Sequence, residues 1–179
     1  MRLIPPVSIK QSLDDVAPGE LLRFRHGGES RFALVGVHND KVHPPEKCLI
    51  TFTAANDGRT EPCYVFPRWG RTAYLSYGTA YFFEFDQSEE AIDFQPFQKE
   101  DPNGVLLLSG ERLFLEARAM SYTQTFGTAY FDIDSHEVVD RPRDSLVVGF
   151  RRWGLYLGTP EQHQTGDQPV IRFDAVRQA

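Results

Sequence analysis

Apolar and polar residues alternate along most of the chain in short runs, which are separated by Gly, Pro and Asn. Runs of about four to eight residues with this period of two are typical of β-strands. The pattern predicts strands at residues 21–25, 32–38, 48–54, 64–66, 73–77, 80–85, 105–108, 113–119, 128–133, 146–150, 155–157 and 170–173. Only residues 12–16 and 88–97 are expected to be helical, and both segments are short. The sequence therefore predicts an all-β fold.

Three pairs of turn-forming residues lie between predicted strands, and each predicts a hairpin: Gly27-Gly28, Asp57-Gly58 and Gly78-Thr79. A two-residue turn at Asp57-Gly58 would place Cys63 opposite Phe52. Cys48 would then lie about 13 Å further along its strand. A disulfide needs Cα atoms within about 7 Å, so the two cysteines are expected to be free thiols.

A weak internal repeat runs through the chain. Residues 66–70 (Phe-Pro-Arg-Trp-Gly) align with residues 150–154 (Phe-Arg-Arg-Trp-Gly), and both halves end on Phe-Asp, at 85–86 and 173–174. This repeat predicts two tandem β-barrel or β-sandwich modules of SH3-like size, residues 16–86 and 102–174, packed on each other and joined by an acidic connector, 87–101. One match opposes the repeat: residues 78–82 and 127–131 are identical, at a spacing that the alignment does not accommodate.

Composition excludes several classes of protein. Apolar residues make up 41% of the 179 residues, enough for a sizeable core, and the net charge of −6 argues against a nucleic-acid partner. No apolar run approaches the about 20 residues of a membrane-spanning helix, and the first residues lack a signal sequence. Two cysteines without metal-site spacing suit a reducing compartment. We therefore expect a cytoplasmic protein without a membrane partner.

Arginine and aromatic residues cluster at the two Arg-Trp-Gly segments. Trp can stack on a ligand while Arg supplies a planar hydrogen-bonding group, so two related binding patches are predicted. The alternative interpretation, which the Gly after each Trp favours, is that both Trp residues fill the core beside a strand bend. The predicted ligand-binding residues are Arg68, Trp69, Arg71, Tyr74, Arg152, Trp153 and Tyr156.

Two carboxylates and an imidazole recur at alternate positions in Asp132, Asp134 and His136. On a strand, all three would project from one face, where they could hold a divalent metal. The alternative is a solvent-facing strand whose like charges discourage aggregation.

The chain contains no phosphate-binding loop, no nucleophile elbow and no dinucleotide fingerprint, and no cofactor is expected. The pattern favours a non-catalytic binding or assembly module for a protein, peptide or small ligand, and it is compatible with a homo-oligomer. The alternative hypothesis is a metal-dependent hydrolase centred on Asp132, Asp134 and His136.

Overall fold

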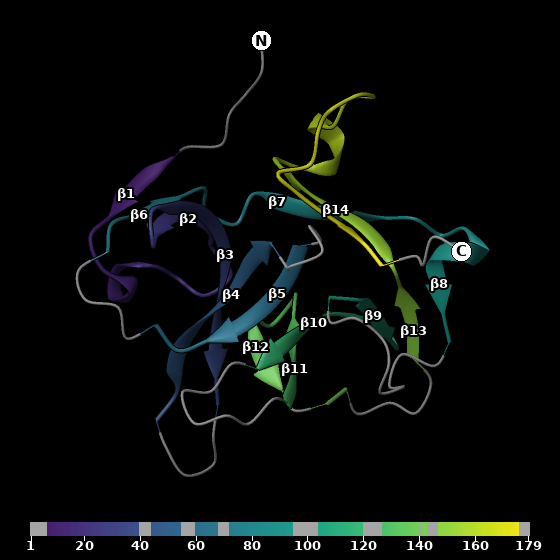
Figure 1. Cartoon of the computed structure of the whole chain (residues 1–179), viewed down its shortest axis with the longest axis horizontal. Coiled ribbons are helices and arrows are strands. Elements are labelled where there is room, and N and C mark those ends of the chain that lie inside the picture. Colours follow the sequence, from purple (N-terminus) through teal and green to yellow (C-terminus); the bar gives the residue numbers. More distant parts are fainter. Residues whose placement is uncertain are drawn as a thin grey trace.

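The computed structural model describes residues 7–39, 44–54, 60–67, 72–94, 104–119, 127–139, 141–142 and 147–175. Over these residues the chain is built from strands, and its helices are single 3-10 turns (Figure 1). These turns are η1 (Leu13–Asp15), η2 (Glu89–Ala91) and η3 (Pro160–Gln162). The predicted all-β fold is confirmed. None of the helical turns in the described ranges has the length and apolar character required to cross a membrane.

The described strands form two sheets. The strands up to residue 86 are β1 (Ser8–Lys10), β2 (Leu21–His26), β3 (Glu29–His38), β4 (Glu46–Ala54), β5 (Thr60–Val65), β6 (Tyr74–Ser76) and β7 (Tyr81–Phe85). Those that follow are β8 (Ile92–Asp93), β9 (Leu106–Ser109), β10 (Arg112–Ala119), β11 (Gly127–Asp132), β12 (Glu137–Val139), β13 (Val147–Phe150), β14 (Arg152–Leu157) and β15 (Ile171–Asp174). The smaller sheet has the order β15-β14-β7, and the larger sheet contains the other twelve strands.

Six strands of the larger sheet pair in a circuit that returns to its start: β3-β4-β5-β10-β11-β12-β3. Four of these pairs are antiparallel, whereas β5 with β10 and β12 with β3 are parallel. Each parallel pair joins a strand of residues 16–86 to a strand of residues 102–174. The two predicted halves therefore share one sheet.

The order of pairing is the same in both halves. Strand β2 pairs with β3 and β6, β3 with β4, and β4 with β5. In the second half β9 pairs with β10 and β13, β10 with β11, and β11 with β12. The registers agree as well, since Leu21 lies opposite Leu34 and Leu106 lies opposite Leu115.

The hairpin of β2 and β3 forms as predicted. Its turn residues Gly27 and Gly28 both have positive φ, 59° and 86°. Two consecutive left-handed residues match the right-handed twist of the flanking strands, and glycine adopts this conformation without steric cost.

The hairpin of β4 and β5 forms with a register one residue away from the prediction. Cys63 lies opposite Thr51, and Pro62 takes the predicted place opposite Phe52. The reason is the length of the connection: Ala54 pairs with Thr60, which leaves an odd number of residues between the strands instead of a two-residue turn. Both cysteines are nevertheless free and buried, and burial raises the pKa of the Cys48 thiol to about 12.

The predicted hairpin around Gly78 is wrong, because β6 and β7 belong to different sheets. Tyr77 N–H donates to the Leu21 carbonyl and Leu21 N–H donates to the Gly78 carbonyl, both at 2.9 Å. These bonds hold the turn to β2, and the chain then crosses to the smaller sheet, where β7 pairs with β14. The predicted helix at 88–97 is also wrong over its described part, where η2 is followed directly by β8.

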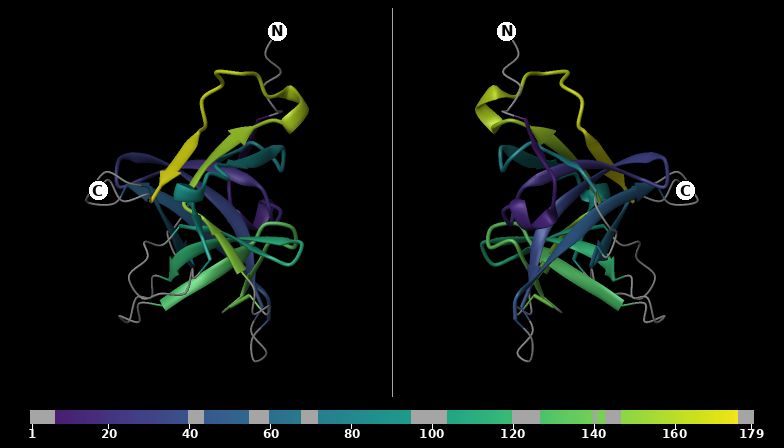
Figure 2. Two further views of the ribbon diagram at one scale, coloured as in Figure 1. Left: turned by 90° about the vertical axis from the view of Figure 1, so that its right-hand side faces the viewer. Right: turned by 90° about the vertical axis from the view of Figure 1, so that its left-hand side faces the viewer.

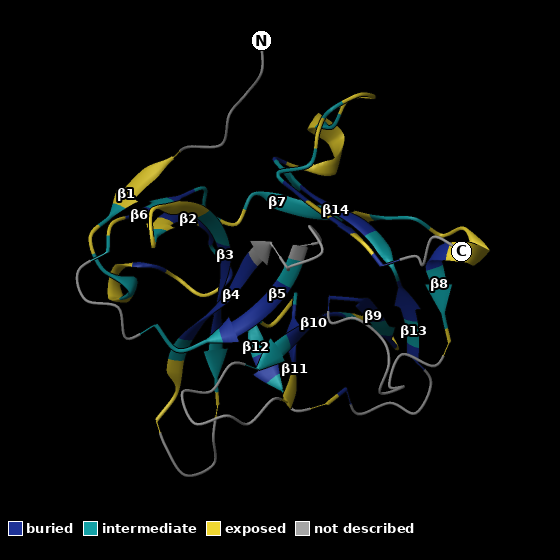
Figure 3. Cartoon of the chain, viewed as in Figure 1, coloured by how far each residue is buried: buried dark blue, intermediate teal, exposed yellow. Residues whose placement is uncertain are grey.

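The main core collects buried side chains from both halves and from both sheets, including Leu21, Ile50, Leu106, Phe131 and Trp153. Figure 3 shows this burial along the central strands, whereas the β1 edge and the connection between β14 and β15 are largely exposed. A smaller cluster lies around Leu22, Phe24 and Tyr74. One face of the three-stranded sheet packs on the main core, and the other face holds the candidate site.

Candidate functional site

The strands β7, β14 and β15 present alternating rows of side chains to the two faces of their sheet. One row is Phe85, Trp153 and Phe173, and the next row on the same face is Phe83, Leu155 and Ile171. All six belong to the main core or pack against it. Since neighbouring residues of a strand point to opposite faces, Arg152, Gly154 and Tyr156 face outward.

Trp153 is a core residue, with 3% of its surface exposed. Its ring is stacked on Phe173 with centroids 5.3 Å apart, and it meets Phe52 and Phe83 edge to face. Its indole N–H donates to the Gly104 carbonyl at 2.7 Å. The buried indole with its engaged N–H fits the alternative interpretation, in which this Trp fills the core, and does not fit a ligand contact.

The outward face holds a groove of about 510 Å³ across the three strands. The side chains that point into it are charged, except for that of Tyr156, and Gly154 contributes no side chain. The residues that line the groove are Glu84, Phe85, Asp86, Arg152, Trp153, Gly154, Tyr156, Arg172, Phe173 and Asp174. Two predicted binding residues, Arg152 and Tyr156, therefore lie in one groove.

Arg152 forms one wall of the groove between two carboxylates. Its Nη1 lies 3.5 Å from Asp86 Oδ2 and its Nε lies 3.4 Å from Asp174 Oδ1. The backbone N–H of Ser88 donates to Asp86 at 2.8 Å, and this bond, assisted by the Ser88 hydroxyl and by Arg152, lowers the pKa of Asp86. Arg152 thus has a carboxylate on each side within this row.

Gly154 leaves the next outward row without a central side chain. Glu84 lies opposite Gly154 on one neighbouring strand and Arg172 on the other. A Cβ added at Gly154 would lie 2.8 Å from Cε2 of Tyr156 and 3.1 Å from Cβ of Pro169. Because the Tyr156 ring occupies the space above the glycine, the floor of the groove is aromatic.

Tyr156 lines the other end of the groove, and His163 packs against it. The Tyr156 ring is stacked on Phe82, with centroids 5.3 Å apart and planes 14° apart. His163, beyond η3 in the connection that projects from the sheet (Figure 2), meets Tyr156 edge-on at 4.6 Å. Its Nε2 lies 3.4 Å from Glu84 and its Nδ1 lies 3.7 Å from Asp167. Burial, reinforced by the Glu84 carboxylate, raises the pKa of the Tyr156 hydroxyl.

Arg172 differs from Arg152 in having no ion pair or hydrogen bond with any other described residue. It is exposed on β15, two residues before Asp174. A guanidinium offers five donors in a planar arrangement that matches a carboxylate. None of the described side chains therefore uses the hydrogen-bonding capacity of this guanidinium.

The predicted patch of the first half is not part of this groove. Arg68, Trp69 and Arg71 lie outside the described residues. Tyr74, 4% exposed, packs its ring 5.7 Å from Phe24 in the smaller cluster. The order of pairing also does not align the two Trp residues: β6 corresponds to β13, and Trp69 precedes β6 in the sequence whereas Trp153 follows β13.

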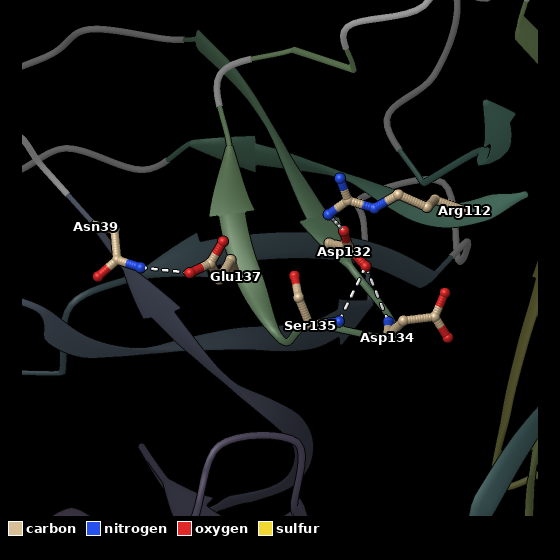
Figure 4. Close-up of polar contacts among 6 residues, drawn as sticks. All are labelled: Asn39, Arg112, Asp132, Asp134, Ser135 and Glu137. Carbon is tan, nitrogen blue, oxygen red and sulfur yellow. Dashed lines mark hydrogen bonds and ion pairs between the residues drawn. The ribbon is translucent and has the colours of Figure 1, made fainter. Parts of the chain in front are cut away.

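The second predicted site, at Asp132, is a tight turn (Figure 4). Asp132 is fully buried, and its Oδ1 accepts from the backbone N–H groups of Asp134 at 2.9 Å and Ser135 at 3.1 Å. Its Oδ2 pairs with Arg112 from β10. Every oxygen of this carboxylate thus has a protein partner.

Strand β11 ends at Asp132, so the prediction that Asp132, Asp134 and His136 alternate along one strand is wrong. The chain turns, and His136 takes a left-handed conformation with φ 61° and lies against Gly19. Asp134 is exposed and points away from Asp132 in Figure 4. Within the described ranges, no three His, Cys, Asp or Glu side chains are arranged to hold a metal ion.

Sequence reasoning missed Glu84, Gly154, Arg172 and His163 as neighbours of Arg152. A signal was present in the alternation of charged and apolar residues at 83–86 and 171–174, and in the Phe-Asp pair that ends both halves. The structure places these two aspartates on either side of Arg152.

No protein-family model, curated protein or solved structure matches the chain.

Proposed function

We propose that this protein is a non-catalytic binding module and that the groove over Gly154 takes a positively charged group of its ligand. The observation that carries the proposal is the outward row around Gly154, where the Tyr156 ring, stacked on Phe82, lies over the glycine and within electrostatic reach of the exposed Glu84 carboxylate. Alternate residues of β7 supply both the carboxylate and one of the rings.

Charge supports a cationic ligand. Three carboxylates and two guanidinium groups line the groove, and the whole chain carries a net charge of −6. Asp86 and Asp174 are engaged by Arg152, whereas Glu84 is exposed beside His163 and is the carboxylate that a ligand cation would approach. Aromatic faces attract cations, with about 0.5–1 kcal/mol at exposed sites and more where water is excluded. A basic side chain would thus gain from both the carboxylate and the rings.

The chemistry of the groove supports binding more than catalysis. The Tyr156 hydroxyl has a raised pKa, so it stays protonated at neutral pH and serves as a hydrogen-bond donor. His163 lies between two carboxylates and edge-on to a ring. These groups provide directed contacts on a fixed sheet, which is what specific recognition requires.

We also propose that the fold arose by internal duplication, with the six strands of the pairing circuit forming a small barrel. The support is the shared pairing order and register, which relate Leu21 to Leu106, Leu34 to Leu115 and Tyr64 to Val138. An experimental structure tests this. Two halves that superpose through a twofold axis between the parallel pairs are expected, and halves without such an axis would contradict it.

Binding is tested by titrating the protein with N-acetylargininamide, followed by NMR chemical shifts. Saturable shifts are expected at residues 82–86 and 152–156, and N-acetylcitrullinamide, which has the same shape without the charge, should not produce them. Glu84→Gln should weaken binding about tenfold, because a charge-assisted hydrogen bond is lost. The matched control is Glu111→Gln, an exposed glutamate in the turn between β9 and β10. Equal binding of both compounds would refute the proposal.

A further inference from the structure

We infer that Arg172 binds a carboxylate of the same ligand, so that the groove selects a basic residue with a free carboxyl group. This inference rests on the proposed function and adds the second half of the ligand. The ligand would be a free basic amino acid or a peptide that ends in one.

The first observation is the arrangement of opposite charges on the two sides of Gly154. Glu84 and Arg172 both lie opposite Gly154, on strands either side of β14. Neighbouring strands are about 4.8 Å apart, so the two backbones are separated by about 10 Å. Both side chains line the groove, and the Tyr156 ring lies over the glycine between their strands. A ligand that carries a positive and a negative group several ångströms apart would satisfy both.

The second observation is the contrast between the two arginines of the groove. Arg152 has a carboxylate on each side, whereas Arg172 makes no ion pair or hydrogen bond with any residue in the described ranges. The carboxylates of Asp86 and Asp174 therefore pair with Arg152 and not with Arg172. An exposed guanidinium beside a groove is well suited to bidentate contact with a carboxylate.

The third observation is that both charges act on one hydroxyl. The Glu84 carboxylate raises and the Arg172 guanidinium lowers the pKa of Tyr156, after the larger effect of burial. Both charged groups therefore lie within electrostatic reach of the ring that covers Gly154. A ligand resting on this ring would contact both ends of the groove at once.

The aromatic pair sets the direction of the ligand. Phe82 and Glu84 are alternate residues of β7, so the ring that stacks on Tyr156 comes from the strand that carries the carboxylate. A cation prefers the face of an aromatic ring, whereas a carboxylate does not. The basic side chain would thus lie over β7 and the carboxylate over β15. Lysine and arginine keep their charge at the end of a flexible stem, which gives the required separation.

The experiment compares N-acetylarginine, which has a carboxylate and a guanidinium, with N-acetylargininamide, which has only the guanidinium. The wild-type protein is expected to bind the acid about tenfold more tightly than the amide, as one added charge-assisted contact predicts. In Arg172→Gln the two affinities should become equal, while binding of the amide is unchanged. Arg25→Gln, at an exposed position of β2, is the matched control and should retain the difference.

Acid and amide that bind equally to the wild-type protein would overturn the inference and leave the proposed function standing. A preference for the acid that persists in Arg172→Gln would also overturn the inference. Failure of both compounds to bind would overturn the proposed function together with the inference. Acetyl-Gly-Gly-Arg separates the two sources: tighter binding than N-acetylarginine supports a peptide terminus, and equal binding supports a single basic amino acid.

Discussion

Two clusters of charged side chains in this molecule look alike in composition and differ in what surrounds them. At the Asp132 turn, a fully buried carboxylate is shared between two backbone N–H groups and Arg112. In the Gly154 groove, Glu84 and Arg172 are exposed and face a position with no side chain. The first cluster fixes the backbone, because a buried carboxylate must find partners within the protein. The second keeps capacity for partners from solution.

The comparison teaches that residue types alone do not mark a site. Asp132, Asp134 and His136 have the composition of a metal site, yet the end of β11 turns their side chains apart. Glu84, Arg152 and Arg172 are far apart in the sequence, and the sheet order β15-β14-β7 brings them together. A cluster of charged residues can bind a ligand when its side chains converge and keep hydrogen-bonding groups that the protein itself does not use.

The largest expected effect comes from the buried side of the strand that carries the groove. Trp153→Ala should reduce the free energy of unfolding by about 3–5 kcal/mol, because it leaves a large cavity beside Phe173 and removes the bond to Gly104. Chemical denaturation measures this, with Trp153→Phe as a milder substitution. A stable Trp153→Ala protein would place the indole outside the core and would remove the distinction between the two faces of the sheet.

The Asp132 turn is expected to have the next largest effect. Asp132→Ala should cost about 2–3 kcal/mol of stability, since two backbone N–H groups and Arg112 lose their acceptor. Asp134→Ala, two residues away and exposed, should remain within about 0.5 kcal/mol of the wild type. Thermal and urea unfolding of both variants check this. Equal losses from the two substitutions would mean that the carboxylate of Asp132 has no special structural role.

Gly154→Ala sharpens the comparison at the groove itself. The new methyl group would press on the Tyr156 ring, and we expect a loss of about 1–2 kcal/mol in the unfolding free energy. The same substitution in a Tyr156→Ala background should cost much less, because the clashing ring is absent. A double-mutant cycle measures this coupling. Additive effects would show that the ring does not cover the glycine.

The smallest expected effect is a pH dependence at the wall of the groove. The pKa of Asp86 is lowered below its ordinary value of 3.8, mainly by the Ser88 N–H. A carboxylate with a lowered folded pKa stabilises the native state above its unfolded pKa, and this stabilisation is lost as the pH falls through the folded pKa. The stability difference between Asp86→Asn and the wild type should therefore become smaller as the pH falls below the unfolded pKa of Asp86. Unfolding curves that stay parallel over this range would contradict the assignment.

Much of the fold follows from the sequence, because its signals are local. Period-two alternation marks one face of each strand for burial, and Gly27-Gly28 provides a turn that other residues would strain. The all-β fold, the hairpin of β2 and β3, and the free cysteines could all be read from neighbouring residues. The aspartates of the two Phe-Asp pairs were visible as well, although their shared contact with Arg152 was not.

Tertiary structure decided which strands are neighbours. Three strand pairs join segments that are far apart in the chain: β5 with β10, β12 with β3 and β7 with β14. No local turn sequence indicates that these strands pair. Such pairs form because apolar faces from remote strands are buried together in one core, a property of the whole chain. The same cause places β7 in a different sheet from β6. The groove over Gly154 exists only where three of these remote segments meet.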